Sequence, residues 1–553
     1  MTQPIRRPWL ILALICIPVF IGSLDLTIVS AFLPEIIIKL ELPVESVVDT
    51  AAWIVTGYLL AYTISMIFMG RVSDLIGRRR VYVASLIIFM IGSAVVAEVD
   101  PQAQHGVAAL IYSIAFRLQG VRPDSPTIAL VTIIIGRVIQ ALGAGALVPV
   151  TLALVGDLFP AAKRAQPLGV IGAIDTLGWV LGHLYGGIMV RLFGQYAQQF
   201  SDFFALLHLN WPAPDWRALF WINLPVSLIA LALTWWNLRS VPQERVKGRF
   251  DFVGTILIVG ALVCLVLGLG ANIELSTSTT QFSDIGGLPP YAALVLAAAV
   301  IMFVLFIIVE VRVRDPLFDL KIFRRRNLSA GLVTNLFVGF CLMIGLVSVP
   351  ILVNIRLPDS SHLSEAALQV GILLSALTVP MALAAIPGGW LSERIGYRWT
   401  AMLGLGLALI GFAAIWQTWT LDVADGIIAV EMALVGVGLG LTFSPISASV
   451  INAADQDKLG ASSALVIIMR LLGMTLSVSI LTAFASQRLA LLAAAALGNN
   501  VVDPMAASDV YAKLTVQVLT EIGLLGAVIC AVALIPALLL KRTETNLTPT
   551  PSL

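Results

Sequence analysis

Six ionisable residues lie well inside long apolar stretches of this 553-residue sequence: Asp25, Arg137, Asp175, His183, Glu431 and Arg470. A charge in the hydrocarbon core of a membrane costs at least about 2.5 kcal/mol, so such residues usually have a function. A buried carboxyl group can bind and release a proton, and a guanidinium can hold a carboxylate ionised until another group displaces it. The sequence therefore predicts a cavity that handles protons, a solute, or both.

Asp25 and Arg137 each allow two interpretations. Burial favours the protonated form of Asp25, which lies slightly outside the middle of its stretch and is predicted to exchange a proton. The second interpretation is a structural carboxylate held by Thr27 or by a helix contact. Arg137, near the middle of the fourth stretch, could hold a carboxylate ionised until substrate displaces it, or it could form a permanent ion pair between helices.

A polar row follows one face of the fifth stretch, where Asp175, Trp179 and His183 are spaced i, i+4 and i+8. His183 is predicted either to relay protons with Asp175 or only to form a hydrogen bond between helices. The neighbouring row consists of three glycines, which we expect to let a helix of another bundle approach closely: Gly178, Gly182 and Gly186.

Glu431 and Arg470 are the candidates in the second half of the chain. Glu431 is expected in the outer third of the twelfth stretch, where its side chain could instead extend to the membrane surface. Arg470 is expected near the middle of the thirteenth.

The composition excludes a water-soluble protein, because 59% of the residues are hydrophobic and only 12% are charged. Fourteen apolar stretches are about long enough to cross a bilayer as helices. They cover residues 9-33, 47-69, 81-99, 127-150, 166-190, 217-238, 252-271, 291-311, 328-354, 366-389, 399-418, 425-449, 460-485 and 514-540.

The basic residues predict the orientation in the membrane. Lys and Arg are concentrated in alternate loops and in the C-terminal tail, with an excess of roughly three to one over the opposite loops. Because basic residues are retained on the cytoplasmic side, the sequence predicts a multi-pass protein of the cell membrane, inner or plasma, with both termini in the cytoplasm.

An internal repeat indicates two related halves. The segment Gly70-Arg-Val-Ser-Asp-Leu-Ile-Gly77 reappears as Gly389-Trp-Leu-Ser-Glu-Arg-Ile-Gly396. We therefore expect an all-α fold with two six-helix bundles, at residues 1-238 and 328-553, and two additional helices inserted at 239-327.

Three segments on the expected outer side are longer than a compact bundle needs: 100-126, 191-216 and 486-512. They are predicted either as short amphipathic helices on the membrane surface or as ordinary loops. All four cysteines lie in separate apolar stretches and are expected to be packing residues. No metal site, cofactor or nucleic-acid partner is expected.

The segment from Gly70 to Arg80 resembles the signature loop of the major facilitator superfamily. Further segments are similar to the fourteen-span drug:proton antiporters of the EmrB/QacA type, namely Leu24-Asp-Leu-Thr-Ile-Val29, Trp53-Ile-Val-Thr-Gly-Tyr-Leu59, Gly136-Arg-Val-Ile-Gln-Ala-Leu-Gly143, Ile222-Asn223 and Asp315-Pro-Leu-Phe-Asp-Leu-Lys-Ile-Phe323. The resemblance covers nearly the whole chain. It implies that Asp25 and Arg137 match acidic and basic positions that the family links to proton transfer.

The signature segment is predicted to be a cytoplasmic gate made of Gly70, Arg71, Asp74, Gly77, Arg78 and Arg79. Asp74 would pair with Arg78 or with a helix end and thereby latch the two bundles. Gly70 and Gly77 would allow a tight turn. Interaction of the arginines with anionic lipid is a second reading.

The resemblance implies a secondary active transporter, not an enzyme, which exports lipophilic or amphipathic compounds in exchange for protons by alternating access. The antiporter pattern normally carries Gly-Pro in the fifth span, where this chain has Gly182-His183, so the direction of transport stays open. A proton-coupled symporter, a lipid exporter and a non-transporting scaffold or sensor are the alternatives. The expected partners are a small lipophilic substrate, protons and membrane lipids, and a periplasmic or extracellular partner protein is left open.

Overall fold

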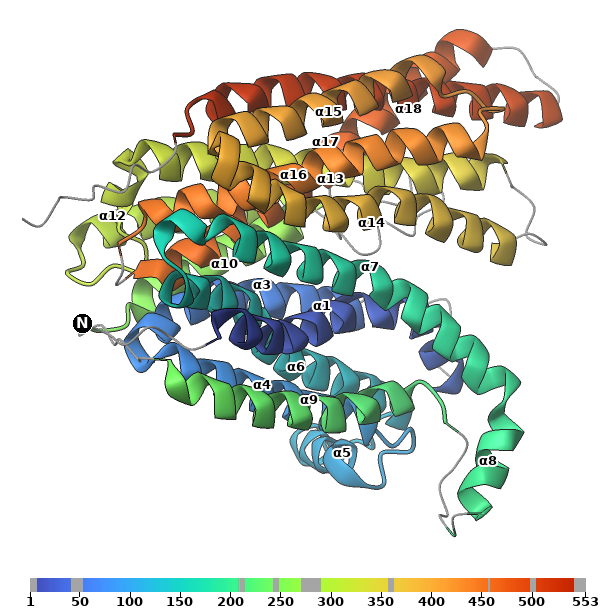
Figure 1. Cartoon of the computed structure of the whole chain (residues 1–553). Coiled ribbons are helices and arrows are strands. Elements are labelled where there is room, and N and C mark those ends of the chain that lie inside the picture. The colour runs from blue at the N-terminus through green and yellow to red at the C-terminus, as the bar shows by residue number, and fades with distance from the viewer. Residues whose placement is uncertain are drawn as a thin grey trace, which may run out of the picture. The chain divides into compact units, whose positions relative to one another are not determined.

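The computed structural model describes residues 7–40, 53–206, 208, 214–241, 248–269, 290–356, 363–455, 458–497 and 504–541. Within these ranges every regular element is helical, and fourteen helices are long and apolar enough to cross a membrane (Figure 1). A helix satisfies its own backbone hydrogen bonds, which is the condition for an apolar segment to be stable in hydrocarbon. The prediction of an all-α protein with fourteen spans is confirmed.

The first six spans are α1 (Pro8–Lys39), α3 (Trp53–Ile76), α4 (Arg78–Ala97), α6 (Ser125–Leu158), α7 (Ala165–Gln195) and α9 (Arg217–Asn237). Two shorter helices, α5 (Gly106–Gln119) and α8 (Ala197–Leu206), lie in the connections. The next two spans are α10 (Phe252–Leu269) and α12 (Ala292–Arg312).

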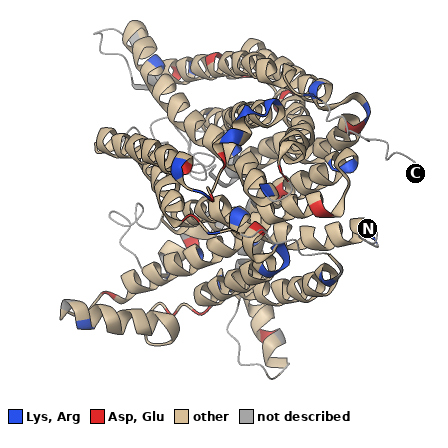
Figure 2. Ribbon diagram, turned by 90° about the vertical axis from the view of Figure 1, so that its left-hand side faces the viewer, with Lys and Arg blue, Asp and Glu red and all other residues tan. Residues whose placement is uncertain are grey.

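The last six spans are α13 (Arg326–Arg356), α14 (Leu363–Ile395), α15 (Tyr397–Thr418), α16 (Asp425–Ala453), α17 (Leu459–Leu497) and α18 (Pro504–Leu538). Figure 2 shows the charged residues as scattered positions on helices that are otherwise uncharged. Each remaining charge on a span therefore needs a local explanation.

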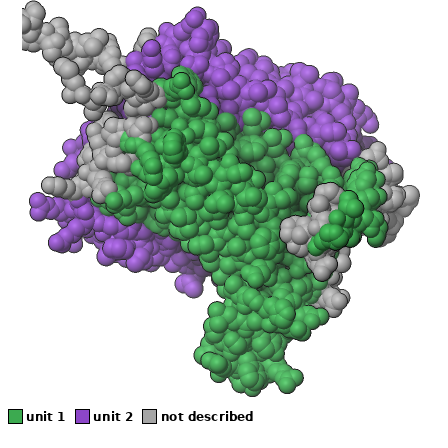
Figure 3. Space-filling model, turned by 60° about the horizontal axis from the view of Figure 1, so that its bottom comes forward, with its two compact units in different colours: residues 1–151, 174–245 green, residues 152–173, 246–553 purple. Residues whose placement is uncertain are grey.

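The chain forms two compact units, coloured separately in Figure 3. Unit 1 contains residues 1–151 and 174–245, and unit 2 contains residues 152–173 and 246–553. Unit 2 thus includes the inserted helices as well as the connection between α6 and α7. The predicted bundles at 1-238 and 328-553, with an insertion at 239-327, stay a prediction.

Each unit has its own core. In unit 1, a buried cluster joins α1, α3, α4, α6 and α9, with Phe32, Trp216 and Phe220 among its large side chains. In unit 2, α14 packs on α16, α15 on both α16 and α18, and α13 on α17, while α10 packs on α12. This core includes Ile28 and Ile133, each within one turn of the ionisable candidates Asp25 and Arg137.

The prediction of a turn at Gly70 is wrong. Helix α3 continues through Gly70, which is buried, and ends only at Ile76. Gly77 alone has a left-handed backbone, with φ of 106°, and Gly396 is its counterpart in the repeat, with φ of 90°. One residue with positive φ is enough to end one helix and begin the next, so the helix can include the charged residues before it.

The long connections differ from one another. Helices α5 and α8 lie within the segments 100-126 and 191-216, so the prediction of short helices there is confirmed, while their place on the membrane surface stays a prediction. For 486-512 both interpretations are wrong, because α17 extends to Leu497 and α18 already begins at Pro504. The run Leu-Ala-Leu-Leu-Ala-Ala-Ala-Ala-Leu before Gly498 is rich in strong helix formers, which explains the extension.

Candidate functional site

Asp25 and Arg137 form a buried ion pair in unit 1. One guanidinium nitrogen of Arg137, Nη1, lies 2.5 Å from Oδ2 of Asp25, and Nη2 donates to the backbone carbonyl of Asp25 at 3.1 Å. Neither side chain is more than 1% exposed. The fold thus brings together two residues that are 112 positions apart, the acid and the base that the sequence analysis identified in the first and fourth spans.

Other polar groups complete this site. Nδ2 of Asn223 on α9 donates to Oδ1 of Asp25 at 2.9 Å, and Oε1 of Gln140 accepts from Arg137 at 2.6 Å. Gln140 in turn donates to Ser93 on α4. The guanidinium also lies over the ring of Tyr58, with 3.8 Å between Cζ and the ring centroid.

Sequence reasoning missed these surrounding groups as site residues. A signal existed for Gln140, which lies three positions after Arg137 and therefore on the same helix face. Tyr58 and Asn223 lie inside segments already recognised as family motifs, yet nothing in their spacing assigned them to Asp25. They come from helices far apart in sequence, so only the packing of unit 1 could reveal them.

The energetics of the pair follow from its burial. Removing two charges from water costs several kcal/mol per ion, and the cost is recovered only with good geometry and additional hydrogen bonds. Asp25 has such bonds on both oxygens, whereas Nε of Arg137 is buried without a hydrogen-bond partner among the described residues. The Asp25 carboxylate therefore has hydrogen-bond donors at both oxygens, whereas the Arg137 guanidinium leaves one of its nitrogens without an acceptor among the described residues.

Asp175 lies on the opposite side of α1 from this pair. Its carboxylate accepts a hydrogen bond of 2.6 Å from Ser23, and the carbonyl of Trp179 accepts one of 2.7 Å from Thr27. Ser23 and Thr27 are spaced i, i+4 and share a face of α1, while Asp25 projects from another face. The side chain of His183 lies outside the part of α7 that the structure describes, so its relay with Asp175 stays a prediction.

The glycines of α7 contact a different helix from the one expected. A side chain at Gly178 or Gly182 would meet the backbone of α1 and the side chains of Ser23 and Thr27. The close approach thus occurs inside unit 1, and the predicted partner from another bundle is wrong for these two positions. The regular spacing of small residues predicts that another helix packs closely against this face of α7, but it does not identify which helix.

Glu431 and Arg470 lie in unit 2, on α16 and α17. Glu431 is 6% exposed and accepts hydrogen bonds from Thr418 at 2.6 Å and from the indole N–H of Trp419 at 2.9 Å, the last residue of α15 and the one after it. Its depth in the membrane stays a prediction. Arg470 has its guanidinium 5.1 Å from the ring centroid of Phe443.

The signature segment forms a charged cluster at the end of α3. Oδ1 of Asp74 lies 3.3 Å from Nη2 of Arg78, and both side chains are buried. Arg71 is also buried, and Arg79 lies over the ring of Trp235 at 4.3 Å. The pairing of Asp74 with Arg78 is as expected, whereas its gating role stays a prediction.

The repeated copy of this segment contacts the start of α7 within unit 2. Oε1 of Glu393 accepts a hydrogen bond of 3.2 Å from the backbone N–H of Gln166, in the first turn of that helix. Beside it, Arg164 donates to the carbonyls of Gly156 and Phe159 and to the side chain of Asn452. An acidic residue is favoured at a helix N-terminus, where free N–H groups carry partial positive charge.

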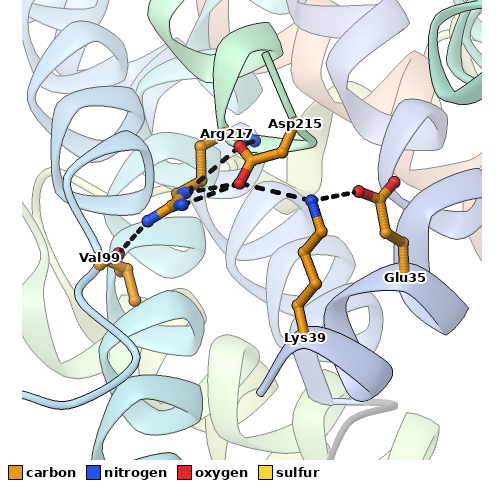
Figure 4. A network of polar contacts seen from close by, with 5 residues as sticks. All are labelled: Glu35, Lys39, Val99, Asp215 and Arg217. Atoms are coloured by element: carbon orange, nitrogen blue, oxygen red, sulfur yellow. Dashed lines mark hydrogen bonds and ion pairs between the residues drawn. The ribbon is translucent and has the colours of Figure 1, made fainter. Parts of the chain in front are cut away.

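A second polar network in unit 1 lies at the other ends of the spans (Figure 4). Asp215 binds Arg217 at 2.8 Å and Lys39 at 3.6 Å, and Lys39 also pairs with Glu35. Arg217 donates to the carbonyl of Val99 as well. The network ties together the end of α1, the start of α9 and the connection after α4.

Known proteins agree with this architecture. The family model for the Major Facilitator Superfamily matches residues 15–356. The structure is also similar to the human organic anion transporter MFSD10, with a TM-score of 0.54 at 16% identity over 96% of this chain and 100% of the other. The proton:xylose symporter XylE gives a TM-score of 0.52 at 13% identity, over 94% of each chain.

The fold and the family match therefore define a membrane transporter. The chain belongs to the Major Facilitator Superfamily. Its relatives include the triacylglyceride transporter of Mycolicibacterium smegmatis, 31% identical over 95% of this chain and 86% of that protein. The triacylglyceride transporter of Mycobacterium tuberculosis strain H37Rv is 31% identical over 85% of this chain and 81% of its own length. These relatives carry the name of lipid transporters and not of EmrB/QacA drug antiporters.

Proposed function

We propose that this protein exports a neutral lipid of the triacylglyceride class, driven by proton movement through unit 1. The observation that carries the proposal is the buried pair of Asp25 and Arg137, a carboxylate that a proton can neutralise inside an apolar helix bundle. The names of the relatives select the lipid, which was one of the alternatives left open by the sequence. The major alternative is export of amphipathic drugs.

The chemistry of a neutral lipid limits how coupling can work. A cationic drug can displace Arg137 or a proton directly, whereas a triacylglyceride carries no charge to compete with either. The proton must therefore act on the conformation, by binding to Asp25 and weakening its attraction to Arg137. Gln140 and Tyr58 would hold the released guanidinium, since both already contact it.

In this proposal the proton changes the packing of α1 against α6 and α9. Loss of the ion pair leaves Asp25 with the hydrogen bond from Asn223, so α1 can shift relative to α6. The proton leaves on the opposite side of the membrane when the pair forms again. This mechanism assumes the predicted orientation with both termini in the cytoplasm. The Asp74–Arg78 pair and the hydrogen bond from Gln166 to Glu393 would then serve as latches on the cytoplasmic side.

A second candidate function is proton-coupled efflux of lipophilic cations. The observation that favours it is the spacing of Asp175 and Trp179 on α7, since residues at i and i+4 share one helix face and a carboxylate and an aromatic ring on the same face suit an organic cation. Under this alternative Asp175 exchanges its bond from Ser23 for the cation.

The test uses purified protein in liposomes that enclose a pH-sensitive dye. A proton gradient is imposed, and a short-chain fluorescent triacylglyceride or a lipophilic cation is added in separate assays. We expect lipid-dependent proton flux that is lost in Asp25→Asn and kept in Glu431→Gln, the matched buried carboxyl group in unit 2. Proton flux with the cation but not with the triacylglyceride would contradict the lipid proposal and favour drug export. Proton flux that persists in Asp25→Asn would show that Asp25 is not the proton site.

A further inference from the structure

The hairpin formed by α5 and the first turn of α6 is fixed at three points. Before α5, the carboxylate of Asp100 accepts hydrogen bonds from the backbone N–H groups of Gln102, Gln104 and His105. After α5, Gly120 adopts a left-handed backbone with φ of 69°, and Asp124 accepts from the backbone and hydroxyl of Thr127. The hairpin is therefore a defined structural element and not an irregular loop.

Helix α5 has two different apolar faces. One face packs on Ile128 of α6 through Ala108, Ile111, Tyr112 and Ala115. The second face consists of Leu110, Ile114 and Leu118, spaced by four residues, which are 59%, 49% and 81% exposed. Val121 at the turn is also exposed, at 69%. An exposed aliphatic row of this kind is unfavourable in water and indicates a contact with an apolar surface.

The position of α5 in the chain identifies that surface. Helix α4 ends at Ala97 and α6 begins at Ser125, so the hairpin connects two span ends on one side of the bilayer. With fourteen residues, α5 is only about 21 Å long, too short to cross a hydrocarbon core of about 30 Å. Figure 1 shows it nearly end-on, across the direction of the long helices of unit 1.

The hairpin carries two arginines between its two anchoring aspartates. Asp100 and Asp124 already accept hydrogen bonds from the chain at the two ends, whereas residues 101–123 contain Arg117 and Arg122 but neither Asp nor Glu. Arg117 lies beside the exposed row on the helical wheel, and both arginines are exposed. Long basic side chains next to a buried apolar face can extend to phosphate groups at the level of the lipid headgroups.

We propose that α5 lies in the interfacial layer of the membrane and binds anionic phospholipid there. Leu110, Ile114 and Leu118 enter the boundary between headgroups and acyl chains, while Arg117 and Arg122 pair with lipid phosphates. The hairpin thus holds the ends of α4 and α6 at a fixed depth. This proposal does not depend on the substrate or on proton coupling.

The test measures the depth of two neighbouring positions on α5 by spin labelling. In a background in which the four cysteines are replaced by alanine, Ile114→Cys and Ser113→Cys are labelled and the protein is placed in lipid nanodiscs. We expect the ratio of oxygen collisions to nickel-chelate collisions to be several-fold higher at 114 than at 113, because oxygen partitions into the bilayer. Equal access of the nickel chelate at both positions, or protection of position 114 from both reagents, would overturn the proposal in favour of water or of a protein partner.

A second measurement tests the charges and requires no cysteine. The double variant Arg117→Gln/Arg122→Gln is expected to immobilise less spin-labelled phosphatidylglycerol, with no change for phosphatidylcholine. Arg191→Gln, an exposed arginine near the end of α7, is the matched control. If the double variant and the control behave alike, these two arginines do not select anionic lipid.

Discussion

Asp25 in unit 1 and Glu431 in unit 2 are both buried carboxyl groups on membrane-spanning helices, but they are held by different donors. Asp25 faces a guanidinium and an amide, whereas Glu431 faces a hydroxyl and an indole N–H. Protonation of a carboxylate that is paired with a cation breaks the ion pair. A carboxyl group held by two neutral donors offers no such competition, so unit 1 is the better candidate for coupling.

The largest effect is expected from breaking the ion pair. Arg137→Gln leaves the Asp25 carboxylate buried without its cation and should lower the free energy of unfolding by about 3–5 kcal/mol. Denaturant unfolding in detergent micelles measures the loss. The double variant Asp25→Asn/Arg137→Gln, which has no buried charge at this position, should recover part of it. A double variant that is less stable than the single one would contradict the comparison.

A smaller effect is expected at Glu431. In Glu431→Gln, one oxygen still accepts a hydrogen bond, but the new amide N–H₂ cannot accept from either donor, which should cost about 1–3 kcal/mol. Trp419→Phe in the same background removes a donor and should restore some stability. Unfolding midpoints provide the readout. Proton coupling should not change in either variant, and a loss of coupling would move the proton site into unit 2.

The approach of α7 to α1, the helix that carries Asp25, can be tested with two glycines. Gly182→Ala would place a methyl group against Thr27 and the carbonyl of Leu24, and should cost about 1–2 kcal/mol, since overpacking exceeds the gain in helix propensity. Gly187→Ala, on the same helix, meets no atom within 4 Å and is the control. Equal stability of the two variants would show that α1 is not held at this crossing.

The smallest effect concerns the surface networks of the two units. Burial alone would raise the pKa of Asp215, but hydrogen bonds and charge from Arg217, together with the charge of Lys39, lower it below the ordinary value. A hydrogen bond from Lys458 lowers the pKa of Asp319 in unit 2. Both carboxylates therefore add stability above about pH 4, the ordinary range of a free aspartate, and this contribution disappears as the pH falls through the lowered pKa.

Asp215→Asn and Asp319→Asn should each cost about 1 kcal/mol at pH 7, because both ion pairs are still partly exposed to solvent. Each should also flatten the loss of stability below about pH 4. Thermal unfolding between pH 2.5 and pH 7 provides the measurement, with wild type as reference. If the dependence of the unfolding temperature on pH below about pH 4 is the same in one variant as in wild type, that network does not contribute to the pH dependence of stability.

The sequence predicted the fold because lipid imposes simple rules on it. Apolar length defines each span, and boundaries such as Arg217 and Asp425 agree with the structure. The same rules fail where a helix leaves the hydrocarbon, as at Ile76 and Leu497, because hydropathy no longer marks the end of a helix there. Capping and side-chain pairing decide those positions.

The candidate site was predictable only in part. Asp25 and Arg137 stand out because charge is rare inside a span. Asn223, Tyr58 and Gln140 are ordinary polar or aromatic residues in such helices, and only packing brings them to the pair. Glu393 is similar, since its partner is a backbone N–H of Gln166, which has no signature in a sequence.

The left-handed backbone at Gly77 and Gly396 also bears on how the two halves of this chain can evolve. Around these positions the copies have diverged, with Arg-Val in one replaced by Trp-Leu in the other and Asp by Glu. A side chain with a Cβ atom is strained at φ of 106° or 90°, whatever surrounds it. The turn glycine is thus a part of the repeat that neither half can replace without strain, whereas the differing residues between the matching Gly, Ser and Ile positions are free to give each half its own contacts.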